Sequence, residues 1–362
     1  MTLNRIGILT GGGDAPGLNA VIRAAVKTAT NVYSCDVIGI RRGFEGLIEV
    51  NGTLTLTPDR VRGILPQGGT ILGAANRGNP FARKVMRDGK EVVEDVSDQV
   101  VQRIHELELD SLIVVGGDGT LRISLELYQK GCPVIGVPKT IDNDIGGTDV
   151  SFGFDTAVAM ATEAIDRLHT TAEAHHRVMI LELMGRNTGF IALEAGLAGG
   201  ADVILIPEIP FTFESIFEKI RSRASAGYHF SIVVVAEGAS PLGGDQVFSI
   251  KGDEVRSPRL GGIGQLVTEN IAQSCGMEAR VTVLGHLQRG GSPTAFDRWL
   301  ATRSGAAAVR LAASGGFGRL VGLRGESIVD VSLEEALAIP RRVDVECDAV
   351  RTARDLGICM GD

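Results

Sequence analysis

Short apolar runs alternate with amphipathic segments along most of the chain. The runs "RIGILT", "SLIVVGG", "VIGVP", "RVMILELMG", "DVILIPE" and "FSIVVVAEG" are rich in valine and isoleucine, and most end near glycine or a charged residue. Such continuous runs are typical of strands that are buried on both faces of a parallel sheet. Segments with helical spacing, such as "LNAVIRAAVKTAT", follow several of them. The repeated order of strand, loop and helix predicts a doubly wound α/β architecture.

Polar residues gather where the predicted strands end. They are found at 11–14, Asp118, Asp142, 185–187, Glu208 and Glu237. Ligands of open α/β sheets bind beyond the carboxyl ends of the strands. This placement therefore favours a functional role over a packing role for these residues.

Composition limits the classes of partner. The chain has 362 residues, which is about right for two domains, and a net charge of -8 with only 4% aromatic residues. These values argue against nucleic acid and anionic membranes as partners. The chain contains neither a signal-like segment nor an apolar stretch of roughly 18 residues, so we expect a cytoplasmic protein with no membrane association. Five scattered cysteines with no Cys-x-x-Cys pair are expected to be free thiols.

Two glycine-rich segments are candidate phosphate sites. In "LTGGGDAPGLNA", glycines would let backbone N–H groups approach a phosphate beside a helix N-terminus. The simpler alternative is a tight turn between strand and helix. In "VVGGDGT", Asp118 could hold Mg²⁺ that bridges phosphate oxygens. It could instead be the N-cap of a helix that starts near Thr120, and diacylglycerol and NAD kinases carry similar strings.

The segment "PKTIDND" is harder to explain by packing alone. If it is extended, Asp142 and Asp144 point roughly the same way, and two close carboxylates disfavour each other without a cation. One could act as a base on a substrate hydroxyl while the other helps to place a metal ion.

Basic residues of the second half form a candidate anion site. Arginine suits bidentate phosphate recognition, and several arginines lie beside glycine-rich segments of an otherwise acidic chain. The candidates are Arg177, Arg186, Arg280, His286 and Arg289. None of the six histidines has the spacing of a zinc site.

Five motifs in order resemble the 6-phosphofructokinase family. They are "GGGDAPGLNA", "GGDGT", "PKTIDND", "MGRNTG" and "VLGHLQRGGSP", and the resemblance spans about residues 6–316. It implies two doubly wound parallel-sheet domains with the active site between them. Residues 1–153 with about 288–338 would bind the nucleotide and Mg²⁺. Residues of about 154–287 with 339–362 would bind fructose 6-phosphate.

The resemblance also implies an activity and a set of site residues. The reaction is transfer of the γ-phosphoryl group of ATP, with Mg²⁺, to the 1-hydroxyl of fructose 6-phosphate, the committing step of glycolysis. Asp142 would be the base, with Thr140 and Arg186 also catalytic, and Asp118 and Asp144 would bind the metal. The donor would contact Gly12, Gly13, Arg77, Gly117, Asp118, Gly119 and Thr120. The sugar phosphate would contact Thr140, Asp142, Arg177, Met184, Gly185, Arg186, Glu237, Arg280, His286 and Arg289.

In the family, the residues that match Arg177 and Arg280 reach in from a neighbouring subunit. The resemblance therefore implies a homodimer or homotetramer with shared active sites.

The phosphoryl donor depends on two positions. Family members that use pyrophosphate typically have aspartate at the position of Gly119 together with a lysine at the position of Lys139, whereas members that use ATP typically have glycine at both. This chain has Gly119 with Lys139. Because glycine leaves space for an α-phosphate, we expect ATP, as in the ATP-using members of the family's mixed-substrate group. The alternative is a diphosphate-dependent fructose 6-phosphate 1-phosphotransferase.

Two other classes of protein share part of the pattern. A lipid or NAD kinase would account for "GGDGT" but for neither "PKTIDND" nor "GHLQRGG". A non-catalytic sugar-phosphate binding module could use the arginines, but it would not need Asp118, Asp142 and Asp144 together.

Overall fold

The computed structural model describes residues 3–75, 78–87, 90–250 and 259–362, and the chain divides into two compact units. Unit 1 comprises Met1–Thr140, Asp144–Asp155 and Arg289–Pro340. Unit 2 comprises Ile141–Asn143, Thr156–Gln288 and Arg341–Asp362. The chain therefore passes repeatedly from one unit to the other, and one of these passages lies inside "TIDND".

Unit 1 is built on a seven-stranded sheet with the strand order β15-β14-β7-β6-β1-β2-β3. The five central strands pair in parallel, whereas β3 and β15 pair antiparallel at the two edges. The parallel pairing predicted from the apolar runs is confirmed for the central strands, and the sheet gains one antiparallel strand at each edge. The strands are β1 (Arg5–Thr10), β2 (Asp36–Ile40), β3 (Thr53–Leu56), β6 (Ser111–Gly116), β7 (Val134–Pro138), β14 (Arg319–Arg324) and β15 (Ser327–Ser332).

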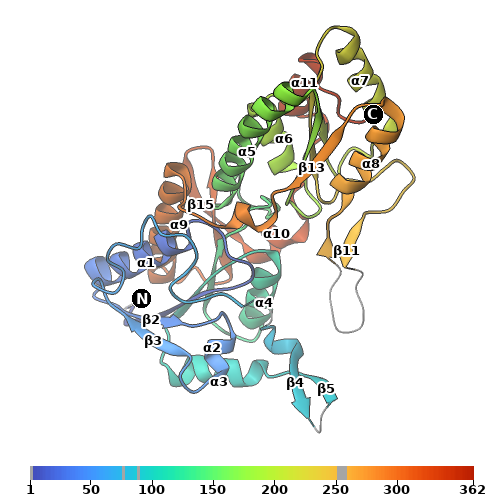
Figure 1. Ribbon diagram of the computed structural model, residues 1–362. Coiled ribbons are helices and arrows are strands. Elements are labelled where there is room, and N and C mark those ends of the chain that lie inside the picture. The colour runs from blue at the N-terminus through green and yellow to red at the C-terminus, as the bar shows by residue number, and fades with distance from the viewer. Residues whose placement is uncertain (1–2, 76–77, 88–89, 251–258) are drawn as a thin grey trace. The chain divides into compact units, whose positions relative to one another are not determined.

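Helices cover both faces of this sheet (Figure 1). Alternate residues of a strand face opposite sides: Ile113 and Val115 of β6 pack with α1 and α9, whereas Leu112 and Val114 pack with α3, α4 and α10. The predicted double winding is confirmed. The helices are α1 (Leu18–Tyr33), α2 (Glu45–Ile48), α3 (Ser97–Glu106), α4 (Asp118–Gln129), α9 (Ala295–Ala313) and α10 (Leu333–Ala338), with a 3₁₀ turn η1 (Pro80–Ala82).

Unit 2 is built on a four-stranded, wholly parallel sheet with the order β13-β8-β10-β9. The strands are β8 (Val178–Leu183), β9 (Val203–Leu205), β10 (Ser231–Ala236) and β13 (Ala279–Val283). The helices are α5 (Phe154–His175), which begins in unit 1, α6 (Phe190–Ala198), α7 (Phe213–Ser225), α8 (Ile263–Cys275) and α11 (Asp348–Asp355), with a 3₁₀ turn η2 (Gly285–Arg289). One face of the sheet packs against α7 and α8.

Two hairpins stand apart from the main sheets. In unit 1, β4 (Arg83–Arg87) pairs with β5 (Lys90–Glu94), and in unit 2, β11 (Phe248–Ile250) pairs with β12 (Arg259–Leu260). The second hairpin lies in the glycine-rich stretch that begins at Gly238, and the β11 residues are exposed.

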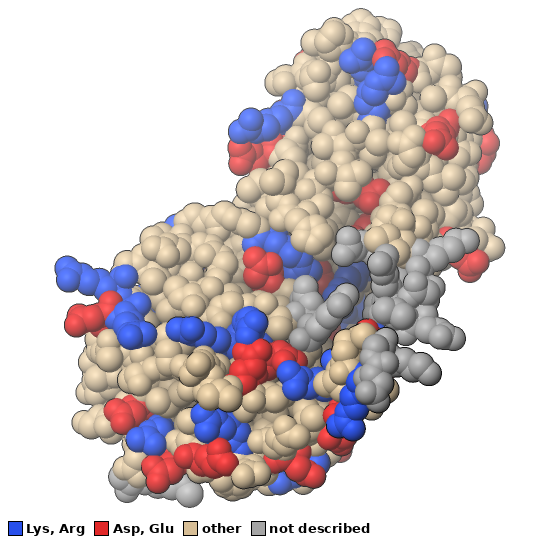
Figure 2. Space-filling model, turned by 60° about the horizontal axis from the view of Figure 1, so that its bottom comes forward, with Lys and Arg blue, Asp and Glu red and all other residues tan. Residues whose placement is uncertain are grey.

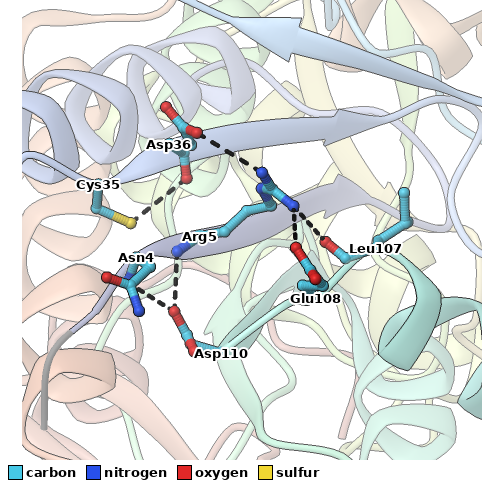
Figure 3. Close-up of polar contacts among 7 residues, drawn as sticks. All are labelled: Asn4, Arg5, Cys35, Asp36, Leu107, Glu108 and Asp110. Carbon is cyan, nitrogen blue, oxygen red and sulfur yellow. Dashed lines mark hydrogen bonds and ion pairs between the residues drawn. The ribbon is translucent and has the colours of Figure 1, made fainter.

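Polar contacts connect the amino-terminal end of β1 with residues just before β6 (Figure 3). The Asp110 carboxylate accepts hydrogen bonds from the backbone N–H groups of Asn4 and Arg5 at 2.6 and 2.9 Å, and Arg5 pairs with Glu108 at 3.0 Å. The nearby Cys35 thiol is buried, and burial, helped by the charge of Asp110, raises its pKa to about 11. The charged groups at this end of the sheet therefore stabilise the local structure by binding one another and the backbone.

The face drawn in Figure 2 mixes basic and acidic side chains. Ion pairs join Arg83 with Glu45 at 2.8 Å and Lys84 with Glu91 at 2.7 Å in unit 1. The Arg83–Glu45 pair is half-buried, whereas the Lys84–Glu91 pair is exposed, and exposed pairs contribute about 0–1 kcal/mol each. They keep basic side chains beside acidic ones instead of in separate patches.

Candidate active site

In unit 1, the loop after β1 borders a pocket. The loop contains Gly11, Gly12 and Gly13, and Gly12 has a φ of +74°, which favours glycine. A pocket of about 260 Å³ is lined by Gly12, Gly13, Asp14, Gly69, Thr70 and Ala74. It lies at the carboxyl end of β1, where the sequence predicts the donor phosphates.

Two cationic side chains bind consecutive carbonyl groups of this loop. The ammonium group of Lys139, at the end of β7, donates a hydrogen bond to the carbonyl of Gly13. The guanidinium of Arg289 donates to the carbonyl of Asp14 at 2.9 Å. Lys139 is only 3% exposed, so its charge is held inside unit 1 beside the loop. These contacts place two positive charges at the carbonyl groups of the loop.

The helix α4 begins at Asp118, with Gly117 as its N-cap and without a side-chain capping bond. The alternative that Asp118 is the N-cap of a helix starting near Thr120 is therefore wrong. The Asp118 carboxylate instead pairs with Arg122, one turn further along, at 2.9 Å. Both side chains of this pair are 40% exposed or more, so their attraction is weak and easily replaced.

Close packing explains two of the glycines. A Cβ atom added to Gly11 or Gly116 would lie 2.5 or 2.4 Å from side-chain atoms of Thr120. Thr120 is buried between the ends of β1 and β6, and larger residues at these two positions would displace it. Gly119 differs, because an added Cβ there meets nothing within 4 Å. The expected open space at Gly119 is therefore present in the structure.

The "TIDND" segment is divided between the two units. Thr140 and Asp144 belong to unit 1, whereas Asp142 belongs to unit 2. Asn143 has a left-handed φ of +55°, so the backbone turns at this residue. The segment is therefore not extended, and the expectation that Asp142 and Asp144 point the same way, which required an extended segment, does not apply. Asparagine tolerates this backbone conformation better than most residues.

In unit 2, Asp142 lies beside the loop that follows β8. Its carboxylate is 3.8 Å from the Arg186 guanidinium, and its side chain is 5% exposed while that of Arg186 is 69% exposed. Glu237, after β10, accepts a hydrogen bond from the Arg186 backbone N–H at 3.1 Å. Burial, and then the negative charge of Asp142, raises the pKa of Glu237 above its ordinary value. These residues form one carboxylate cluster with an exposed arginine at its edge.

Two other predicted sugar contacts, Met184 and Gly185, belong to the same loop, whereas His286 does not. Met184 donates its backbone N–H to the buried Gln288 side chain at 2.8 Å. Gly185 has a φ of +149°, and a Cβ atom there would lie 2.6 Å from the carbonyl oxygen of Thr188. His286 lies in η2 and is exposed.

The predicted 6-phosphate arginines of unit 2 share an acidic partner. Arg177 pairs with Glu278 at 2.9 Å, and Arg280 also binds this carboxylate. The neighbouring guanidinium of Arg177 lowers the pKa of Glu278. Arg289 belongs to unit 1 and bonds to Asp14 as described above.

Sequence reasoning did not single out several residues that shape these clusters. They are Gly69, Thr70 and Ala74 at the pocket, Thr188 beside Asp142, and Gly238, where an added Cβ would lie 1.9 Å from the Arg186 carbonyl. Thr188 lies inside the quoted "MGRNTG" motif, but nothing local indicates its distant partner. The predicted donor residue Arg77 lies outside the described residues.

Comparison with known proteins decides the family. The sequence profile named "Phosphofructokinase" matches residues 5–312. The chain belongs to the phosphofructokinase family. The family predicted from the five motifs is therefore confirmed.

Phosphofructokinases with two different donors in their names are similar to this chain. A protein named ATP-dependent 6-phosphofructokinase from Chloroflexus aggregans is 56% identical, covering 99% of this chain and 98% of its own. ATP-dependent 6-phosphofructokinase 2 of Clostridium perfringens is 50% identical with 99% of both chains covered. The pyrophosphate--fructose 6-phosphate 1-phosphotransferase of Streptomyces coelicolor is 51% identical over 94% of this chain and 96% of its own.

Solved phosphofructokinase structures share the fold. The enzyme of Saccharomyces cerevisiae matches with a TM-score of 0.78 and 30% identity, covering 98% of this chain but 47% of the yeast chain. A pyrophosphate-dependent phosphofructokinase from Nitrosospira multiformis matches with a TM-score of 0.81 and 18% identity, over 99% and 93% of the two chains. The predicted phosphofructokinase type of α/β fold is confirmed.

Two features are absent from the residues that the structure describes. No helix among them has the length and apolar character needed to cross a bilayer. Within the same ranges, no three histidine, cysteine or acidic side chains gather as a group that could hold a metal ion.

Proposed function

We propose that this protein phosphorylates the 1-hydroxyl of D-fructose 6-phosphate with ATP, giving D-fructose 1,6-bisphosphate. The observation that carries the proposal is the buried Asp142 carboxylate, 3.8 Å from Arg186 and beside Glu237 in unit 2. This cluster offers a base for a sugar hydroxyl with a cation at its edge. Relatives named ATP-dependent 6-phosphofructokinase, 49–56% identical over nearly their full lengths, support the same activity.

The chemistry needs positioning and charge neutralisation more than covalent help. In our proposal, Asp142 accepts the proton of the sugar 1-hydroxyl while the oxygen of that hydroxyl bonds to the γ-phosphorus of ATP. The bond from the γ-phosphorus to the oxygen that links it to the β-phosphate breaks, and ADP leaves. Thr140 would contact the transferred group, and Arg186 would act as the catalytic cation beside Asp142. A positioned base of this kind accelerates a reaction by about 10²–10⁴.

For the donor, we propose that ATP binds beside the glycine-rich loop of unit 1. Gly12, Gly13 and Gly117 to Thr120 would contact it, and Arg77 is proposed from the motif alone. The open space at Gly119 supports a nucleotide, because an α-phosphate and ribose need room there. Pyrophosphate is the alternative donor. It is supported by Lys139, whose ammonium lies at the loop, and by relatives of 51% and 48% identity with pyrophosphate in their names.

Membership of this family implies a divalent metal, and we propose Mg²⁺ held by Asp118 and Asp144. Mg²⁺ prefers oxygen ligands and commonly binds one or two carboxylates together with substrate phosphates. Two carboxylates of unit 1 suit that demand, and the exposed Asp118–Arg122 pair is weak enough to be replaced by a metal ion. When bound, the ion would neutralise charge on the phosphate oxygens.

For the sugar phosphate, we propose that Met184, Gly185, Arg186 and Glu237 contact the fructose moiety. Arg177, Arg280, His286 and Arg289 would hold the 6-phosphate, with Arg177 and Arg280 supplied by a partner subunit of a homodimer or homotetramer. Unit 1 would be the nucleotide-binding domain and unit 2 the sugar-binding domain. A glycolytic enzyme of this kind would work in the cytoplasm.

The test is incubation of the purified protein with fructose 6-phosphate and Mg²⁺, adding either ATP or pyrophosphate. We expect fructose 1,6-bisphosphate and ADP with ATP, and no product when a chelator removes the metal. A lack of product with both donors would overturn the proposed function. A strong preference for pyrophosphate would overturn the donor assignment alone.

A further inference from the structure

The proposed base sits on a very short piece of unit 2. Ile141–Asn143 belong to unit 2, whereas their neighbours Thr140 and Asp144 belong to unit 1. The piece is neither helix nor strand, and its backbone turns left-handed at Asn143. The orientation of Asp142 is therefore not set by a helix or a strand of its own, and side-chain contacts from unit 2 can contribute to it.

Thr188 is a side chain of unit 2 in the right place. Its hydroxyl oxygen lies 2.8 Å from the backbone carbonyl oxygen of Asp142, which is 46 residues earlier in the chain. Thr188 is 3% exposed and Asp142 is 4% exposed, so water does not compete for this contact. A buried hydrogen bond of this kind is costly to leave unmade.

The same hydroxyl lies 3.0 Å from the carbonyl oxygen of Gly185, and it has only one hydrogen to donate. The Gly185 carbonyl already accepts the backbone N–H of Thr188 at 3.0 Å. The Asp142 carbonyl is the nearer of the two acceptors. The hydroxyl hydrogen therefore serves Asp142 better than Gly185.

The residues around Thr188 make this contact a link between two parts of the cluster. Thr188 closes the turn that begins at Gly185, and the intervening Arg186 faces the Asp142 carboxylate and donates its N–H to Glu237. Holding the Asp142 carbonyl to this turn fixes the base relative to the groups proposed to contact the sugar.

We infer that Thr188 is a positioning residue for Asp142: its hydroxyl sets the orientation of the base through the backbone, without touching the substrate. The inference rests on the proposed function of the cluster. A misplacement of about 1 Å at a reacting group can cost about 100-fold in rate. Loss of this hydroxyl therefore lowers kcat by about 10-fold to 100-fold, while ATP binding in unit 1 is unchanged.

The decisive comparison is Thr188→Ser with Thr188→Ala, because these two variants differ only in the hydroxyl group. Thr188→Val serves as the variant closest in shape to threonine. We expect Thr188→Ser to retain kcat within about threefold of the parent, and Thr188→Ala and Thr188→Val to lose at least about 10-fold. The KM for ATP should stay at the parent value in all three.

A matched control is Thr268→Val in α8. The Thr268 hydroxyl is also buried in unit 2, but it donates to the Gly264 carbonyl of its own helix at 2.6 Å. This variant should keep the parent kcat, and thermal unfolding of all variants should report intact folding.

Three results would overturn the inference. The first is a folded Thr188→Ala enzyme whose kcat equals that of Thr188→Ser. The second is a change in Thr188→Ala that affects only the KM for fructose 6-phosphate. The third is a kcat loss in Thr268→Val as large as that in Thr188→Ala. The parent is assayed first with fructose 6-phosphate and ATP. An inactive parent contradicts the proposed function, whereas an active parent with unaffected Thr188 variants contradicts only the positioning role.

Discussion

The two clusters of predicted site residues differ in composition and in charge. In unit 1, glycines line a pocket, and the cations Lys139 and Arg289 bind carbonyl groups of the loop beside it. In unit 2, Asp142 and Glu237 lie close enough for one charge to affect the pKa of the other. A site with open backbone and nearby cations suits a polyphosphate, whereas close carboxylates suit a group that receives a proton.

Two glycines, one in each cluster, also differ in how they tolerate a new side chain. An added Cβ at Gly119 of unit 1 meets open space, whereas one at Gly238 of unit 2 would lie 1.9 Å from the Arg186 carbonyl. Gly119 can thus accept a small side chain, whereas Gly238, like Gly11 and Gly116 of unit 1, cannot do so without displacing a neighbour. This difference agrees with relatives of similar identity that carry ATP or pyrophosphate in their names.

The largest effect should come from the base in unit 2. Asp142→Asn keeps the shape of the side chain but removes its ability to accept the proton, so we expect kcat to fall by about 10²–10⁴. Donor binding, measured by calorimetry, should stay close to the parent value. Asp149→Asn makes the same exchange in unit 1, at an exposed carboxylate that accepts the Gly325 N–H, and should remain active. A loss in Asp142→Asn below about tenfold would contradict its role as the base.

The next effect concerns Arg280, which shares Glu278 with Arg177. Arg280→Met would remove the proposed charge-assisted hydrogen bonds to the 6-phosphate, and bonds of this kind are worth about 1.5–3 kcal/mol. We expect the KM for fructose 6-phosphate to rise about 10-fold to 100-fold with little change for ATP.

Mixing this variant with Asp142→Asn tests whether sites are shared. In a hybrid oligomer, the chain with an intact Asp142 would receive an intact Arg280 from its partner, so activity should recover after subunit exchange. Sedimentation should show a dimer or larger. A fully active monomer, or hybrids that form without recovery, would refute sharing.

A smaller effect is expected on the donor side. Gly119→Asp places a carboxylate where the α-phosphate of ATP would pass, and two unit charges about 4 Å apart repel by about 4 kcal/mol at an effective dielectric constant near 20. Solvent screening reduces this repulsion, and we expect kcat/KM for ATP to fall at least about tenfold. Use of pyrophosphate should fall much less.

Gly119→Ala is the matched control, because it adds only the Cβ atom, which meets open space. It should keep the ATP activity of the parent. Lys139→Gly should also leave the enzyme active with ATP. An equal loss in Gly119→Ala and Gly119→Asp would show that bulk, and not charge, decides the donor.

The smallest effect is on stability. Burial raises the pKa of Glu237, so the folded state keeps its proton to higher pH than the unfolded state does. Stability is therefore lost as pH rises from the ordinary glutamate value through the raised one, by at most about 1.4 kcal/mol per pH unit. Glu237→Gln has no such titration and does not lose stability in this way. The Tm of Glu237→Gln relative to the Tm of the parent should therefore increase as pH rises from 4 to 7.

Glu278→Gln provides a control of opposite sign. Arg177 lowers the pKa of Glu278, so the parent gains stability as pH rises toward the ordinary glutamate value. The Tm of this variant should fall behind that of the parent as pH rises toward the ordinary glutamate value, and it should run parallel to the parent above that value. Identical pH profiles of Tm for both variants would contradict the contrast between the two carboxylates.

Much of the molecule follows from the sequence alone. Buried strands appear as continuous apolar runs, and turns at strand ends appear as glycines, because both are local consequences of burial and backbone geometry. The double winding and the position of the polar clusters at strand ends follow from that pattern, whereas the expectation of two sheets came from the family resemblance. The family follows from five motifs in order.

Only the tertiary structure decided which distant groups meet. Lys139 binds a carbonyl 126 residues away, Arg289 one 275 residues away, and Thr188 one 46 residues away. It also decided that β3 and β15 close the sheet antiparallel and that "TIDND" turns at Asn143. Hydrophobic periodicity records which face of an element is buried. It carries no information about which backbone carbonyl a remote side chain will reach, because that partnership depends on how the elements pack in three dimensions.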